Sequence, residues 1–175
     1  MNLLELSEQE ILRRNSLEKM RNMGLDPYPA ALYPVDAYSV EIKEIFRDDE
    51  KKRYVTIAGR IMSRRIMGKA SFVELQDSKG RIQVYVTRDQ ICLSDDNSDF
   101  YNVVFKKLLD IGDFIGIKGF VFRTQMGEIT IHAEELTVLS KSLRPLPIVK
   151  EKEGVVYDGY TSALRCPATK YPCAD

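Results

Sequence analysis

Apolar residues near the start of the chain recur at the spacing of one helical face, and they are Ile11, Leu12, Leu17, Met20 and Met23. Ser7 and Glu10 have the spacing of a capping box, in which each side chain binds a backbone N–H at the helix start. Gly24 is a natural stop, so we expect a helix over residues 7–23. The opposite side of this helix mixes both charges, which favours docking on protein over docking on a membrane. A second, short helix is expected over residues 39–46.

From Tyr54 onward apolar and polar residues alternate, which is the pattern of strands with one buried face. The segments with this pattern are 54–61, 70–76, 81–86, 115–121 and 128–133. A helical segment over residues 99–109 separates the third segment from the fourth, and Gly59 predicts a sharp bend or a close backbone approach. This order predicts a mainly β protein, a five-stranded OB-fold Greek-key barrel preceded by a helical segment. Another small barrel of the same class is the alternative.

The composition is that of a globular protein. Of 175 residues, 44% are hydrophobic and 30% are charged, and 26 basic residues balance 26 acidic ones. No apolar run approaches the roughly 20 residues that cross a membrane, and the N-terminus lacks the pattern of a signal peptide, so we expect a cytoplasmic protein. Three scattered cysteines and a single histidine offer little for a metal site or a catalytic triad, and no cofactor is expected. His132 is expected to be an ordinary surface histidine.

The neutral total hides an uneven distribution of charge. Residues 1–50 carry 6 basic and 11 acidic side chains, whereas residues 51–88 carry 10 basic and 2 acidic ones, a net charge of +8. Such a segment is either a binding face for a polyanion or an ordinary solvated surface, and charge density alone leaves both open. Arg64 and Arg65 lie at the end of the first expected strand, where they could hold a phosphate or a base.

An aromatic residue lies on the polar face of the second expected strand. If the hairpin closes around residues 77–80, Phe72 faces Tyr85 and Glu74 faces Gln83 on the outer surface. Single-stranded nucleic acid stacks on aromatic side chains in basic grooves, and a glutamine can hydrogen-bond a base edge. The alternative for Phe72 is packing beneath the N-terminal helix in a second, smaller core.

Several longer segments resemble one enzyme family, and they are residues 13–17, 23–29, 58–72, 75–77, 80–86, 112–113, 124–128 and 143–147. In this order they resemble the start of bacterial-type class II lysyl-tRNA synthetases (lysine–tRNA ligases), over roughly residues 5–160. The run Met-Gly-Lys-Ala-Ser-Phe at residues 67–72 separates the chain from the related aspartyl and asparaginyl enzymes. The resemblance implies an OB-fold domain that binds the anticodon of tRNA-Lys.

The resemblance also implies roles for single residues. The family's phenylalanine that stacks on the middle anticodon uridine corresponds to Phe72, and the glutamine that packs on the same base corresponds to Gln83. The arginine that contacts the anticodon corresponds to Arg65, and the glutamate that helps to select uridine corresponds to Glu128. Two further basic candidates for anticodon binding are Arg64 and Lys69.

The expected organisation has three parts: an N-terminal helical segment (1–50), an OB-fold anticodon-binding domain (51–147), and a linker toward an absent catalytic domain with an atypical tail (148–175). None of the three class II motifs occurs, so we expect the chain alone to be inactive; ATP and Mg²⁺ are implied only for the full-length family enzyme. The implied partners are the tRNA-Lys anticodon stem-loop, the catalytic domain and the second subunit of a homodimer. The alternative function is a non-catalytic OB module that binds single-stranded nucleic acid or a protein.

Overall fold

The computed structural model of the chain describes residues 6–48, 52–91, 100–146, 150–152 and 155–157. Met1–Pro145 form one compact unit and Leu146–Asp175 a second. The second unit contains a short hairpin of β6 (Lys150–Lys152) and β7 (Val155–Tyr157). All candidate site residues lie in the first unit. The expected boundaries at residues 50 and 147 stay predictions.

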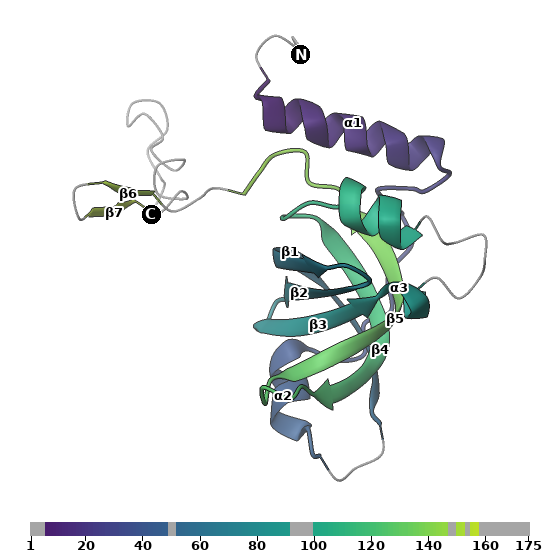
Figure 1. The fold of residues 1–175 in the computed structure, drawn as a ribbon, viewed down its shortest axis with the longest axis vertical. Helices are drawn as coiled ribbons and strands as arrows, with labels where there is room; N and C mark the ends of the chain where they lie inside the picture. Colours follow the sequence, from purple (N-terminus) through teal and green to yellow (C-terminus); the bar gives the residue numbers. More distant parts are fainter. Residues whose placement is uncertain (1–5, 49–51, 92–99, 147–149, 153–154, 158–175) are drawn as a thin grey trace, which may run out of the picture. The chain divides into compact units, whose positions relative to one another are not determined.

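Five strands form a closed barrel in the order β1-β2-β3-β5-β4 (Figure 1). Their bounds are β1 Tyr54–Met67, β2 Ala70–Gln76, β3 Arg81–Thr87, β4 Phe114–Arg123 and β5 Ile129–Ser140. Neighbouring strands are antiparallel except β3 and β5, which run parallel. This arrangement is that of an OB-fold, so the predicted fold is confirmed.

Helices precede the barrel and interrupt it. They are α1 (Glu8–Asn22), α2 (Ser39–Ile45), α3 (Arg88–Ile91) and η3 (Phe100–Leu108). The expected helix between the third and fourth strands is η3, and the two expected N-terminal helices are α1 and α2. In η3 the backbone is wound wider than in an α-helix, as the bond from the N–H of Leu109 to the carbonyl of Val104 shows.

The barrel core follows from strict alternation along β2 and β3. Val73, Leu75, Ile82 and Val84 are buried, while the residues between them face outward. Burial of such a side chain contributes about 1.5–3 kcal/mol, so the register of this hairpin is strongly determined. The observed pairing joins Phe72 to Tyr85 and Glu74 to Gln83, as the sequence predicts.

The first strand contains a close backbone approach and a bulge. A Cβ atom on Gly59 would lie 2.9 Å from the carbonyl oxygen of Gln76, which confirms the close approach predicted there. Farther along β1, Ile61 pairs with Leu75 but Ser63 pairs with Glu74, so Met62 is an extra residue. The bulge shifts the alternation of inward and outward side chains in the second half of β1.

The N-terminal helix keeps its predicted cap but not its predicted apolar face. Ser7 and Glu10 form the capping box. Leu17 and Met20 are buried, whereas the other predicted members of the face are exposed, namely Ile11, Leu12 and Met23. Arg13 is buried instead, and its guanidinium donates to the backbone carbonyls of Ser142 and Ile111 at 3.0 and 2.8 Å. The predicted apolar stripe is therefore buried only in part, and Arg13 lies in the contact because two carbonyl groups at the barrel end need a donor.

Asp77 attaches α2 to the turn between β2 and β3. Its carboxylate accepts from the N–H and hydroxyl of Ser39, at 2.6 and 2.9 Å, and from the N–H groups of Lys79 and Gly80, both at 2.8 Å. Burial alone raises the pKa of Asp77, but these four hydrogen bonds outweigh it, so the pKa lies below its ordinary value. The position of α2 beside the barrel therefore depends on an ionised Asp77.

We predict that Asp77→Ala lowers the free energy of unfolding by about 1–2 kcal/mol at pH 7, the worth of solvent-screened hydrogen bonds to a charge. Because the folded pKa is lowered, this contribution is present above the unfolded pKa, about 4, and is lost as the pH falls through the folded value. Urea denaturation of both proteins across this pH range measures the difference. Asp89→Ala, at an exposed carboxylate on α3, is the control with little expected change. A difference between Asp77→Ala and the parent that stays constant below pH 4 would contradict the assignment.

Candidate functional site

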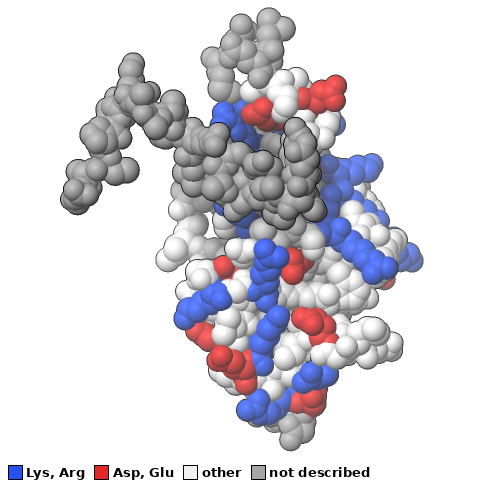
Figure 2. Space-filling model, turned by 90° about the vertical axis from the view of Figure 1, so that its left-hand side faces the viewer, with Lys and Arg blue, Asp and Glu red and all other residues white. Residues whose placement is uncertain are grey.

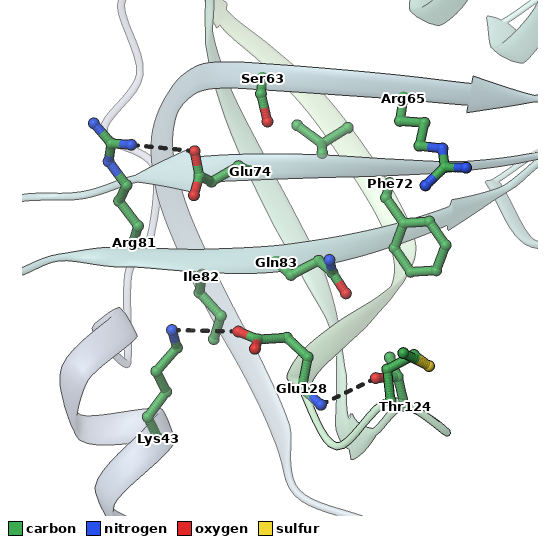
Figure 3. A pocket seen from close by; sticks show the side chains of 12 residues that line it. Lys43, Ser63, Arg65, Phe72, Glu74, Arg81, Ile82, Gln83, Thr124 and Glu128 are labelled. Carbon is green, nitrogen blue, oxygen red and sulfur yellow. Dashed lines mark hydrogen bonds and ion pairs between the residues drawn. The ribbon is translucent and has the colours of Figure 1, made fainter.

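A groove of about 630 Å³ lies on the outer face of β1, β2 and β3, beside the turn that joins β4 to β5 (Figure 3). Four predicted site residues line it: Arg65, Phe72, Gln83 and Glu128. They come from β1, β2, β3 and the turn between β4 and β5, so the fold brings together side chains up to 63 positions apart. Helix α2 borders the groove through Lys43.

Phe72 provides an aromatic surface at one end of the groove. Its ring packs on Tyr85, with centroids 4.9 Å apart and planes inclined by 41°. Both rings lie on the outer face of the sheet, opposite to the buried Val73 and Val84. Phe72 thus belongs to the groove, while α1 packs on η3, so the alternative of a small core beneath α1 does not describe its environment. A partly exposed ring supported from one side can stack a base on the other.

Gln83 has one end of its amide fixed. The hydroxyl of Thr130 donates to its Oε1 at 2.9 Å, across the parallel pairing of β3 and β5. The amide nitrogen has no hydrogen-bond partner among the described residues, so its two N–H donors are available in the groove.

Glu128 projects from the turn between β4 and β5. Gly127 adopts a φ of 85°, a backbone conformation that residues other than glycine rarely adopt. The N–H of Glu128 donates to the Thr124 hydroxyl at 3.1 Å. These features direct the Glu128 carboxylate toward α2, where Lys43 Nζ lies 3.6 Å from its Oε1 (Figure 3). The carboxylate is therefore held by backbone geometry on one side and by a cation on the other.

The three basic candidates have different positions. Arg65 is exposed at the groove and has no ion pair or hydrogen bond among the described residues. The guanidinium of Arg64 is directed elsewhere, because it donates to the carbonyls of Phe105 and Leu109 at the end of η3, at 2.6 and 2.7 Å. Lys69 is exposed in the turn between β1 and β2 and does not line the groove. The RNA-binding roles of all three stay predictions, with Arg65 alone placed beside the other candidates.

The basic segment does not form a uniformly positive surface. On the face drawn in Figure 2, Lys and Arg side chains run along the middle with carboxylates beside them. Three described cations of the segment have acidic partners: Arg81 lies 3.3 Å from Glu74, Lys79 lies 3.1 Å from Glu41 of α2, and Arg88 lies 2.9 Å from Asp89. The net charge of residues 51–88 therefore overstates the positive charge available to a ligand, and Arg65 is the unpaired cation of the groove's described lining.

His132 differs from its sequence-based expectation. Its ring lies among aromatic side chains of the outer face, 5.2 Å from Tyr85 and 5.0 Å from Phe120 between centroids. Its Nε2 is buried and has no hydrogen-bond partner among the described residues. Burial lowers its pKa below the ordinary value, so the imidazole is neutral at pH 7. The expectation of a surface histidine with its hydrogen bonds satisfied was therefore wrong.

Sequence reasoning missed several residues at or beside the groove, among them Lys43, Thr130 and Met126. Lys43 belongs to a helix that precedes the barrel, and Thr130 is a buried hydroxyl in a strand. Met126 is 94% exposed at the tip of the turn and lines the groove. The sequence carries no signal for these residues, because a single exposed apolar side chain is ordinary on a protein surface.

Two structural observations bear on other functions. Among the described residues, no group of three or more His, Cys, Asp or Glu side chains could hold a metal ion. Within the same ranges no helix is both long and apolar enough to cross a membrane. The cysteines at positions 92, 166 and 173 lie outside the described residues.

Comparison with known proteins agrees with this geometry. A family model of the OB-fold nucleic acid binding domain matches residues 55–139. The chain is 67% identical over 165 residues to the lysine–tRNA ligase of Porphyromonas gingivalis, a match that covers 93% of this chain and 28% of the relative. It is 64% identical to the enzyme of the same name from Azobacteroides pseudotrichonymphae (89% of this chain, 31% of the relative). It is 58% identical to the lysine–tRNA ligase of Christiangramia forsetii, a match that covers 89% of this chain and 27% of the relative.

The chain thus spans less than a third of the length of these relatives. The matched region contains the whole barrel as far as residue 139, and with it every residue that lines the groove on the strands. Residues 55–139 therefore match the model of the OB-fold nucleic acid binding domain, and the chain is similar to part of the lysine–tRNA ligases named above.

Proposed function

We propose that this chain binds the anticodon of a tRNA that accepts lysine, as the anticodon-binding module of a lysine–tRNA ligase. The observation that carries the proposal is the convergence of Arg65, Phe72, Gln83 and Glu128 on one groove of an OB barrel. Relatives that share 58–68% identity with the chain and bear the name lysine–tRNA ligase support it.

Each side chain has a separate task in this proposal. A base stacks on the ring of Phe72, and the free amide nitrogen of Gln83 donates to its edge. The carboxylate of Glu128 accepts the N3–H of uracil, a group that cytosine lacks. Because a carboxylate repels phosphate, Glu128 contributes selectivity, whereas Arg65 contributes affinity for the backbone.

In the complete enzyme this module would read the tRNA while another part of the protein attaches lysine with ATP and Mg²⁺. The chain spans 27–31% of the relatives' length, which leaves ample room for that part. We propose the catalytic domain and the second subunit of a homodimer as protein partners, and a cytoplasmic location. Residues of the relatives beyond this chain would supply the site for ATP and its metal.

A protein-interaction module is the second candidate function, and one observation favours it. Leu12 on α1 is 56% exposed, next to the exposed Ile11. The two functions differ in their response to salt, because binding that releases counterions from RNA weakens steeply as salt rises. The test compares the affinity for an anticodon stem-loop at about 50 and about 200 mM salt, a range over which binding through phosphate contacts weakens strongly. An affinity that does not change over this range would favour the second candidate.

We predict that Phe72→Ala weakens binding of a tRNA-Lys anticodon stem-loop by about 1–3 kcal/mol, or roughly 5- to 150-fold in Kd, the worth of one base stacked on an aromatic ring. Fluorescence anisotropy with a labelled stem-loop measures the change. Tyr54→Ala is the matched control, because Tyr54 is an aromatic residue 62% exposed on β1 that does not line the groove. Equal losses in the two variants would argue against stacking on Phe72.

We predict that Glu128→Gln narrows the preference for a middle uridine by about tenfold, since a neutral amide can donate as well as accept. Four stem-loops that differ only in the middle base provide the measurement. Glu135→Gln removes a carboxylate of β5 that is paired with Lys118 and is the control. If the parent protein binds all four stem-loops equally well, Glu128 has no role in selection.

A further inference from the structure

Lys43 is the one residue of helix α2 that lines the groove. Its Nζ lies 3.6 Å from the carboxylate of Glu128, and the two side chains are 41% and 52% exposed. Figure 3 shows Lys43 extending from the helix toward Glu128, on the side of the groove opposite to β1. The end of the groove beside Glu128 is thus formed by a carboxylate and an ammonium group together.

The position of Lys43 is determined by the fold. Ser39 begins α2, and both its N–H and its hydroxyl bind the carboxylate of Asp77. Ile42, the neighbour of Lys43, is buried in the hydrophobic core. A helix fixed at its first residue and by a buried side chain can place the next residue reproducibly at the groove.

Stability does not explain the contact between Lys43 and Glu128. An ion pair as exposed as this one contributes about 0–1 kcal/mol, and its side-chain entropy cost offsets part of that. Its electrostatic effect on a ligand is larger, since a lone carboxylate in the groove would repel an approaching phosphate chain. An ammonium group beside it makes the local charge neutral without removing the acceptor.

The pair also presents a specific hydrogen-bonding pattern. A carboxylate accepts and an ammonium donates, so the two groups together match a base edge with a donor next to an acceptor. Uracil has this edge, because its N3–H lies between two carbonyl oxygens. Cytosine has an acceptor at N3, and adenine has an acceptor at N1 beside an amino group. In both bases the lone pair of this ring nitrogen would repel the carboxylate oxygen of Glu128. Guanine shares the N1–H beside O6, but on a larger ring system.

We propose that Lys43 is a further specificity residue of the groove: its ammonium donates to a carbonyl oxygen of the base whose imino N–H Glu128 accepts. The inference rests on the proposed function. Lys43 and Glu128 then read two adjacent atoms of the base, and the free amide donors of Gln83 are available to the remaining carbonyl. The selection of uridine is thereby shared between the barrel and the helix that precedes it.

The test compares Lys43→Met with Lys79→Met. Lys79 makes a similar exposed ion pair, to Glu41 of the same helix α2, but does not line the groove, so its substitution removes the same charge near the same element. Dissociation constants are measured for stem-loops with uridine, cytidine or adenosine in the middle position. We expect Lys43→Met to weaken uridine binding about tenfold more than Lys79→Met, the worth of one charge-assisted hydrogen bond, and to leave cytidine and adenosine binding at the Lys79→Met level.

The possible results separate the two proposals. If the parent protein binds none of the stem-loops, the proposed function fails and the role of Lys43 with it. If the parent prefers uridine but Lys43→Met behaves as Lys79→Met does, or weakens all three stem-loops equally, the specificity role of Lys43 is wrong and the proposed function stands. Combining Lys43→Met with Glu128→Gln should cost less than the sum of the single changes, because both read one base. If Lys43→Met does not fold, Lys43→Arg, which keeps the charge and donors, must retain the uridine preference.

Discussion

The parallel pairing of β3 with β5 is the interaction on which the site depends. It closes the barrel, and its register places Gln83 opposite Thr130. That register sets the hydrogen bond that orients the Gln83 amide and brings the preceding turn, with Glu128, to the edge of the same sheet face. Without it, the hairpin of β2 and β3 would carry an aromatic ring and an amide but would lack the carboxylate of Glu128 beside them.

A second constraint comes from outside the barrel. The turn of the β2–β3 hairpin contains Asp77, whose carboxylate holds the first residue of α2. The same hairpin therefore supplies two walls of the groove directly and fixes the helix that supplies Lys43. The acidic N-terminal segment in this way contributes Lys43 to the lining of the groove, although its net charge opposes that of an RNA-binding element.

The sequence predicted what depends on alternation over short distances. The outward pair of Phe72 and Tyr85, and the pairing of Glu74 with Gln83, follow from a tight turn and a period of two. The meeting of Lys43 with Glu128 could not be predicted, because the two residues are joined only through the closed barrel and a docked helix. The burial of Arg13 could not be predicted for a related reason. The spacing of apolar residues gives no information about backbone carbonyl groups elsewhere in the fold that need a hydrogen-bond donor. The charge of the basic segment was misleading because sequence does not show which cations have acidic neighbours across strands.

The bulge at Met62 has a consequence for the two adjacent arginines. Before it, odd-numbered residues of β1 point into the barrel, and after it Arg64 pairs with the inward Val73 while Arg65 pairs with the outward Phe72. Because of one inserted residue, two identical side chains have different surroundings: Arg64 donates to carbonyl groups at the end of η3, and Arg65 is a free cation at the groove. If Met62 were instead paired as a regular strand residue, the alternation that begins before the bulge would continue, and Arg65 would turn inward and Arg64 outward. The different positions of the two arginines are therefore set by the number of residues in the strand rather than by the chemistry of the side chains.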